Sequence, residues 1–190
     1  MVFLEALRQL LFTEGRQNCM LVHLSLVPSV GSAGEQKTKP TQHSVKELCS
    51  LGLYPDLIVC RCATQLCEST KMKLSTFCHV QPSHVISVHD VSNIYFVPLI
   101  LVEQGMHQLV KKTLHMDAIT SLNAPDLIAW EEMARRIDNL QHKISVAIVG
   151  KYTGERVSNV QRMQLFFSMH YIVVVVVVVI LNHLVLYVSS

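Results

Sequence analysis

Three short apolar segments, each with the composition of a β-strand, constrain the fold of this chain more than any other feature. The middle one, DLIVCRCA, is apolar at nearly every position, as in strands that are buried on both faces of a parallel sheet. A segment with helical spacing of apolar residues follows each strand. The strands are expected at 20–28, 56–63 and 84–91, and the helices at 40–53, 69–78 and 98–114. This alternation predicts an α/β fold with a mostly parallel sheet.

The rest of the chain divides into further regions. Residues 1–12 are apolar on one helical face and predict an amphipathic helix. A loop-like stretch and a polar-faced helix at 128–143 indicate a linker, and SVAIVGKYTG at 145–154 predicts the first strand of another α/β domain. We therefore divide the chain into a first domain at 1–114, a linker at 115–143, the start of a second domain at 144–156 and an apolar tail at 157–190.

Composition excludes two classes of protein. The chain has 190 residues, of which 50% are apolar and 16% are charged, and its formal net charge is +2. A disordered chain carries fewer apolar residues. A protein that binds nucleic acid through bulk charge carries a larger excess of Lys and Arg. We therefore expect a folded chain with no nucleic-acid partner.

The six cysteines indicate a reducing compartment. The sequence shows no export signal, and the cysteine spacing is not that of a secreted disulfide framework. Cys60 and Cys62 flank Arg61 in a predicted strand, so both face one side of it. A metal site would need two further soft ligands at suitable spacing, and none is obvious. We expect reduced, buried cysteines in a cytosolic protein. The cysteines are at positions 19, 49, 60, 62, 67 and 78.

The apolar tail has two interpretations. No Asp, Glu, Lys or Arg follows Arg162, and seven consecutive valines occupy positions 173–179. Residues 171–188 are just long enough to cross a bilayer, although Asn182 and His183 would lie well inside it. One hypothesis is therefore a tail anchor in a membrane. The other, which we favour, is that the valine run is translated repetitive DNA and not evolved protein.

The segment GEQKTKPTQ at 34–42 carries the most chemical information. Lys37 and Lys39 are two residues apart, so in an extended backbone both ammonium groups project to the same side. A helix is expected directly afterwards, and the free N–H groups and partial positive charge of its first turn favour an anion. Pro40 suits that first turn, and Gln42 offers an amide to a base edge or a ribose. The pattern predicts a phosphate-binding site, with a solvated basic loop as the alternative.

Other candidate residues are weaker by themselves. Lys73 is expected on a helix surface. His89 and Asp90 end a predicted strand, where α/β sheets place ligand contacts, although an ordinary turn has the same composition. The sequence has no Gly-rich phosphate loop of the GxxxxGK[ST] kind. No Ser/His/Asp arrangement, acid/base carboxylate pair or metal-binding His/Glu spacing is recognisable.

The block GEQKTKPTQHSVKELCSLGLYPDLIVCR resembles the CTP synthase family. Collinear similarity extends over about residues 1–154. MVFLEALRQ resembles the helix after that family's acidic magnesium and nucleotide loop, and FCHVQPSHVISVHDVSNIY resembles a later block of its amidoligase domain. SVAIVGKYTG resembles the opening of its glutaminase domain.

This resemblance implies a Rossmann-like amidoligase domain joined by a linker to a class I glutamine amidotransferase domain. The family's first domain uses ATP and Mg²⁺ to phosphorylate the O4 oxygen of UTP, and ammonia released from glutamine by the second displaces the phosphate to give CTP. A cytoplasmic homotetramer is also implied, with the pyrimidine site across a subunit interface. The residues that match UTP- and CTP-binding positions are Lys37, Thr38, Lys39, Pro40, Thr41, Gln42 and Lys73. Those that match a segment beside the ATP adenine are His89, Asp90 and Val91.

The resemblance is partial, and it implies a chain without catalytic residues. The family's phosphate loop, its catalytic lysine and its magnesium carboxylates would precede Met1, and the glutaminase nucleophile would follow Gly154. We therefore expect no catalytic residue, no metal ligand and no CTP formation by these 190 residues alone. Phe96 stands where relatives tend to carry a basic residue. Two alternatives stay open: a non-catalytic protein that binds or regulates full-length subunits, and a tail-anchored membrane protein.

Overall fold

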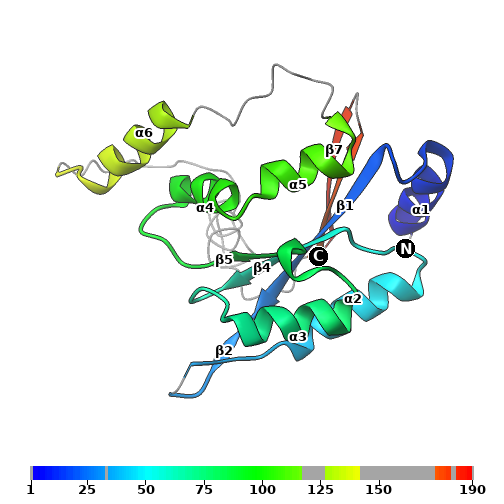
Figure 1. The fold of residues 1–190 in the computed structure, drawn as a ribbon, viewed down its shortest axis with the longest axis horizontal. Helices are drawn as coiled ribbons and strands as arrows, with labels where there is room; N and C mark the ends of the chain where they lie inside the picture. The colour runs from blue at the N-terminus through cyan, green and yellow to red at the C-terminus, as the bar shows by residue number, and fades with distance from the viewer. Residues whose placement is uncertain (1, 33, 117–126, 142–173, 181–182, 190) are drawn as a thin grey trace, which may run out of the picture.

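A five-stranded sheet forms the centre of the molecule (Figure 1). The computed structural model describes residues 2–32, 34–116, 127–141, 174–180 and 183–189. The strand order is β5-β4-β1-β6-β7, in which β1, β4 and β5 run parallel and β6 and β7 are antiparallel to their neighbours. The predicted α/β class is therefore confirmed. The strand bounds are β1 (Cys19–Val27), β4 (Leu57–Cys62), β5 (Val85–Val88), β6 (Val174–Ile180) and β7 (His183–Ser189).

Helices cover both faces of the three parallel strands (Figure 1). On one face, α2 (Lys39–Ser50) and α3 (Glu68–Cys78) pack against the sheet. On the other face lie α4 (Val97–Glu103) and α5 (Met106–Thr113). The amphipathic helix predicted at 1–12 is α1 (Val2–Glu14), and its leucines pack near the start of β1. The resulting layers are helix, sheet and helix, the arrangement expected when parallel strands are joined by crossover helices.

Strand β4, which lies between β5 and β1, shows why both faces are covered. Leu57 and Val59 belong to the core beneath α4 and α5, whereas Ile58 and Cys60 belong to the core beneath α2 and α3. Successive side chains of a strand point to opposite faces, so a continuous apolar run requires an apolar layer on each side. The burial on both faces that the sequence predicts for this strand is confirmed.

The helix expected at 98–114 is two helices. α4 ends at Glu103 and α5 begins at Met106, with Gly105 between them at φ +76°. That left-handed conformation is accessible to glycine without a steric penalty, and it interrupts the helical hydrogen-bond ladder. The prediction of one continuous helix is therefore wrong, although its apolar stripe still faces one core.

Four short elements complete the described chain. They are β2 (Ser29–Val30), β3 (Glu35–Gln36) and the 3₁₀ turns η1 (Pro82–His84) and η2 (Ile94–Phe96). The expected polar-faced helix of the linker is α6 (Ile128–Asp138), which lies at the periphery (Figure 1). The strand expected at 145–154 falls outside the described residues, and the domain boundaries stay predictions.

The valine-rich tail contributes β6 and β7. Residues 176–180 pair antiparallel with β1, and β7 pairs with β6 beyond them. A membrane-crossing helix was one hypothesis for 171–188, but 174–180 and 183–189 are strands. Within the part of the chain that the structure describes, no helix combines the length and the apolar character needed to cross a bilayer.

The prediction of buried cysteines is correct for four positions, is met only in part at Cys49, which is half-buried, and is wrong at Cys67. Cys60 and Cys62 are buried on one side of β4, and Arg61 between them is exposed. Cys19 and Cys78 are also buried, and all six thiols are free. Cys67 is exposed, because it stands at the N-cap position of α3 instead of within a strand or helix face.

His23 is a buried polar side chain in the middle of β1. Its side chain has no exposed surface, Nε2 lies 2.9 Å from Ser44 Oγ on α2, and Nδ1 has no hydrogen-bond partner. Burial disfavours the imidazolium and lowers the pKa of His23 to about 4. Between pH 6.5 and about pH 4, the folded protein therefore keeps His23 neutral, whereas the unfolded chain would protonate it.

We predict that the free energy of unfolding decreases at acid pH because His23 becomes protonated. Its folded pKa lies below the ordinary value of 6.5, so its contribution is complete above pH 6.5 and is lost as the pH falls toward 4. The loss amounts to up to about 3 kcal/mol of unfolding free energy. Urea unfolding of His23→Gln across pH 4.5–7.5 should show a shallower pH dependence than wild type. The exposed His43 provides the control, and equal slopes for His23→Gln and His43→Gln would contradict the prediction.

Candidate functional site

The carboxyl ends of the three parallel strands bring the predicted site segments to one edge of the sheet. Val27 pairs with Cys62, and Arg61 pairs with Val88, so the strands end side by side. Segments 28–42, 63–67 and 89–96 follow these ends. This is the edge at which open α/β sheets bind ligands. The sequence-predicted residues all follow strand ends here except Lys73, which is on α3.

A short two-stranded arm separates β1 from α2. In it, Ser29 pairs with Gln36 and Val30 with Glu35. The backbone N–H of Lys37 donates to the Pro28 carbonyl at 2.8 Å, which closes the base of the arm. The chain therefore returns to the end of β1 before the predicted phosphate-binding segment begins.

The start of α2 differs from one expectation. Thr38 has φ −88° and ψ −15°, a helical conformation, so the predicted extended geometry of Lys37 to Lys39 is wrong. The Thr38 hydroxyl does not cap the helix and instead accepts from Gln42 Nε2 at 3.0 Å. Thr38 thus provides no side-chain cap. Because Pro40 has no N–H and Thr41 is buried, Lys39 is the residue of the first turn that is placed to meet an anion. Pro40 lies in the first turn, as predicted.

Thr41 has a structural role in this segment. It is fully buried, its hydroxyl donates to the Leu26 carbonyl at 3.1 Å, and it accepts from Ser25 Oγ at 2.9 Å. These bonds hold the first turn of α2 against the end of β1. Thr41 therefore positions the segment from inside the fold.

Glu35 pairs with one of the predicted lysines and feels the charge of a second. Its carboxylate lies 2.6 Å from Lys37 Nζ at the surface. The hydrogen bond and charge of Lys37, and then the charge of Lys73, lower the pKa of Glu35. Lys73 on α3 is thus close enough to act on the same carboxylate as Lys37. Lys39, the first residue of α2, is exposed and lies two positions after Lys37 in the chain.

Gln36 joins this lysine-bearing segment to the loop after β4. Its Nε2 donates to the Gln65 carbonyl at 2.9 Å and to the Thr64 carbonyl at 3.3 Å. Its Oε1 accepts from the Cys67 backbone N–H at 3.2 Å. One side chain therefore bridges two of the three segments at the sheet edge. Sequence analysis missed this role, because it depends on residues about 30 positions away.

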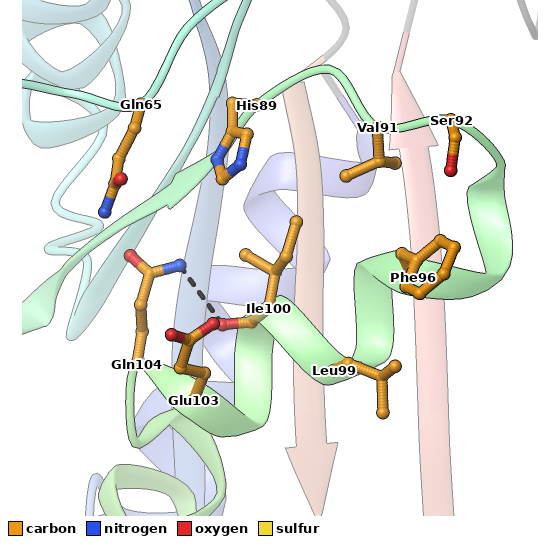
Figure 2. A pocket seen from close by; sticks show the side chains of 9 residues that line it. All are labelled: Gln65, His89, Val91, Ser92, Phe96, Leu99, Ile100, Glu103 and Gln104. Carbon is orange, nitrogen blue, oxygen red and sulfur yellow. Dashed lines mark hydrogen bonds between the residues drawn. The ribbon is translucent and has the colours of Figure 1, made fainter. Parts of the chain in front are cut away.

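A cavity of about 540 Å³ lies beside the third segment (Figure 2). The loop after β5 forms one side, with His89, Val91 and Ser92, and α4 forms the other. Gln65 also lines it, so Gln36 contacts a residue of the cavity wall. The Nδ1 atom of His89 is buried without a hydrogen-bond partner. Such an atom at a cavity wall suits a polar ligand group.

Of the three predicted adenine-segment residues, two line the cavity and one does not. His89 and Val91 are on its wall. Asp90 forms an ion pair with Arg61 at the exposed end of β4, and its backbone N–H donates to the Ala63 carbonyl at 3.3 Å. Asp90 therefore fixes the path of the loop that carries the other two.

Gln104 is a second residue that sequence analysis missed. Its Oε1 accepts from the Ser87 N–H at 2.8 Å and its Nε2 donates to the Ser87 carbonyl at 2.7 Å. This pair of bonds satisfies the free edge of β5, as a neighbouring strand would. The sequence carries no local signal for this role, because the contact joins residues 17 positions apart.

The described residues do not fit a magnesium site. Across the ranges that the structure covers, no group of three or more His, Cys, Asp or Glu side chains is arranged to hold a metal ion. Mg²⁺ needs oxygen ligands in near-octahedral geometry, usually including carboxylates. We therefore assign no step of chemistry through a metal to these residues.

Comparison with known proteins identifies the family of this chain. The family model described as CTP synthase N-terminus matches residues 1–116. CTP synthase 1 of Homo sapiens is 53% identical over 153 residues, which cover 80% of this chain and 26% of that protein. The chain belongs to the CTP synthase family. CTP synthases of Dictyostelium discoideum and Lawsonia intracellularis are 46% and 45% identical over 166 and 152 residues.

The match covers most of this chain but only a small part of each relative. The chain spans about a quarter of the length of the curated relatives it matches, 26–29% in the three cases above. CTP synthases are ligases, so the chain belongs to an enzyme family.

Cys67 is the exposed thiol at this site. Hydrogen bonds from the Ser69 and Thr70 hydroxyls, at 3.2 and 3.0 Å, lower the pKa of Cys67 to about 7. Burial instead raises the pKa of Cys60 and raises that of Cys78 to about 11. Reactivity follows the exposed thiolate.

We predict that Cys67 reacts first with iodoacetamide. At pH 7 its rate should exceed those of the buried thiols by at least about 100-fold, with half-maximal rate near pH 7. Mass spectrometry of partially labelled protein identifies the site, and Cys67→Ser should remove the fast phase. Equally fast labelling of Cys49, a half-buried thiol whose pKa burial raises, would contradict the prediction.

Proposed function

We propose that this chain provides the pyrimidine-nucleotide and adenine contacts of a glutamine-dependent CTP synthase. The observation that carries the proposal is the joint placement of the lysine-bearing segment and the cavity at one sheet edge, bridged by Gln36. UTP and CTP are proposed as ligands of the first, and ATP as a ligand of the second. Pyrimidine nucleotide biosynthesis is the corresponding process.

The UTP and CTP site is proposed at the start of α2. The exposed Lys39 and the positive end of the α2 dipole suit a triphosphate. Lys37 is paired with Glu35 at the surface, where such a pair contributes at most about 1 kcal/mol. A triphosphate, with several negative charges, competes well with one exposed carboxylate for that lysine. Lys73 supplies a further positive charge to the same place.

The ATP adenine is proposed to occupy the cavity beside α4. The volume lies in the range of ligand pockets, roughly 300–1,000 Å³. Phe96, Leu99 and Ile100 offer apolar surface to a flat base. The unpartnered Nδ1 of His89 offers a hydrogen bond to a base nitrogen or amino group.

Family membership supports further proposals about the complete enzyme. We propose a cytoplasmic homotetramer that also uses Mg²⁺ and glutamine, with the pyrimidine site shared between subunits. The described residues bind and orient nucleotides in this scheme. Phosphoryl transfer and ammonia release are assigned to parts of the enzyme beyond them, so we expect no CTP formation by the 190 residues alone.

We predict that Lys39→Ala weakens UTP binding by about tenfold. Removing one charge-assisted contact to a phosphate costs about 1.4 kcal/mol, which is a tenfold change in Kd. Isothermal titration of the 190-residue chain with UTP measures it. The matched control is Lys46→Ala, an exposed lysine further along the same helix.

Uridine distinguishes phosphate contacts from base contacts. Because it has no phosphates, its binding should be the same in wild type and Lys39→Ala. Equal loss of UTP affinity in Lys39→Ala and Lys46→Ala would overturn the proposed phosphate site. A loss confined to uridine would place the base, and not the triphosphate, beside Lys39.

A further inference from the structure

Helix α6 is fastened to the loop that borders the cavity. We call residues 91–96 the rim segment, because Val91, Ser92 and Phe96 line the cavity within it. The Asp138 carboxylate of α6 accepts from Ser92 Oγ and from Asn93 Nδ2, both at 2.5 Å. These bonds lower the pKa of Asp138, so it remains an ionised acceptor. The same residue that contributes a hydroxyl to the cavity wall is thus held by the linker helix.

Two further contacts attach α6 to the rim segment. Asn93 Nδ2 also donates to the Ala134 carbonyl at 3.1 Å. The indole N–H of Trp130 donates to the Tyr95 carbonyl at 2.7 Å, and the two rings pack with centroids 5.9 Å apart. Both ends of α6 therefore contact the segment.

Asn93, which Asp138 contacts, also forms hydrogen bonds within the rim segment. Asn93 Oδ1 accepts from the Tyr95 N–H at 3.1 Å and begins the turn η2, and the Asn93 carbonyl accepts from the Phe96 N–H at 3.2 Å. Phe96 then leads directly into α4, the other wall of the cavity. A change in the Asn93 side chain is consequently passed to both walls.

We propose that Asp138 is a positioning residue for the nucleotide cavity, and that it couples docking of α6 to binding of an adenine nucleotide. This inference rests on the proposed ATP site and adds its regulation. Nucleotide that orders the rim segment favours the docked position of α6, and by linkage the docked helix strengthens nucleotide binding by the same factor.

Asp138→Ala tests the coupling, with Glu131→Ala as the matched control. Glu131 is on the same helix and pairs with Arg135 at 2.6 Å, so Glu131→Ala removes the same charge from a carboxylate whose partner lies within α6. Hydrogen exchange of the 190-residue chain should be about tenfold faster at Tyr95 and Phe96 in Asp138→Ala. ATP affinity should fall three- to tenfold, and UTP affinity should stay unchanged. In wild type, ATP should slow exchange of α6 amides, and in Asp138→Ala it should not.

The outcomes separate this inference from the proposed function. ATP binding that Asp138→Ala leaves unchanged would overturn the coupling and keep the ATP site. Equal effects of Asp138→Ala and Glu131→Ala would also overturn it, because they would report general loss of α6. No ATP binding by wild type would overturn the ATP site in this chain and the coupling with it. Asp138→Asn, which keeps one acceptor oxygen, should give an intermediate effect.

Discussion

Parallel pairing of β1, β4 and β5 is the constraint on which the rest of this structure depends. Parallel strands bring their carboxyl ends to one edge, and each strand must be followed by a crossover that covers a face. Residues 28–42, 63–67 and 89–96 become neighbours for this reason alone. The polar contacts of Gln36 and Asp90 then adjust segments that the sheet has already brought together.

The antiparallel partner of β1 illustrates how little a strand edge demands. Backbone N–H and C=O groups along β1 are satisfied by any extended segment, and residues 176–180 meet that need. Register is normally set by the side-chain pattern. Seven identical valines carry no such pattern, because a shift by one or two residues places valine opposite the same partner. This pairing is therefore compatible with either origin proposed for the tail, and it gives no support to a membrane function.

The sequence predicted most of the fold because its signals are local. The apolar runs at β1, β4 and β5 and the helical spacing at α2 and α3 each need only neighbouring residues to be recognised. The helix break at Gly105 was not predicted because the apolar stripe continues across it. The spacing of apolar residues carries no information about a single left-handed residue. The exposure of Cys67 was missed because it depends on where the β4 loop meets α3.

The candidate site was predictable only in part, for the same reason. Lys37, Lys39 and the helix start stand next to each other along the chain, so their chemistry was evident. Gln36, Gln104 and Asp138 act across 17 to 46 positions, through single side chains that satisfy backbone or loop groups. The exposed hydrogen bonds of Gln36 and Asp138 add little to global stability. They matter because a loop that forms a cavity wall has few other contacts to hold it. The Asp138 carboxylate can therefore set the positions of the Ser92 hydroxyl and the Phe96 ring.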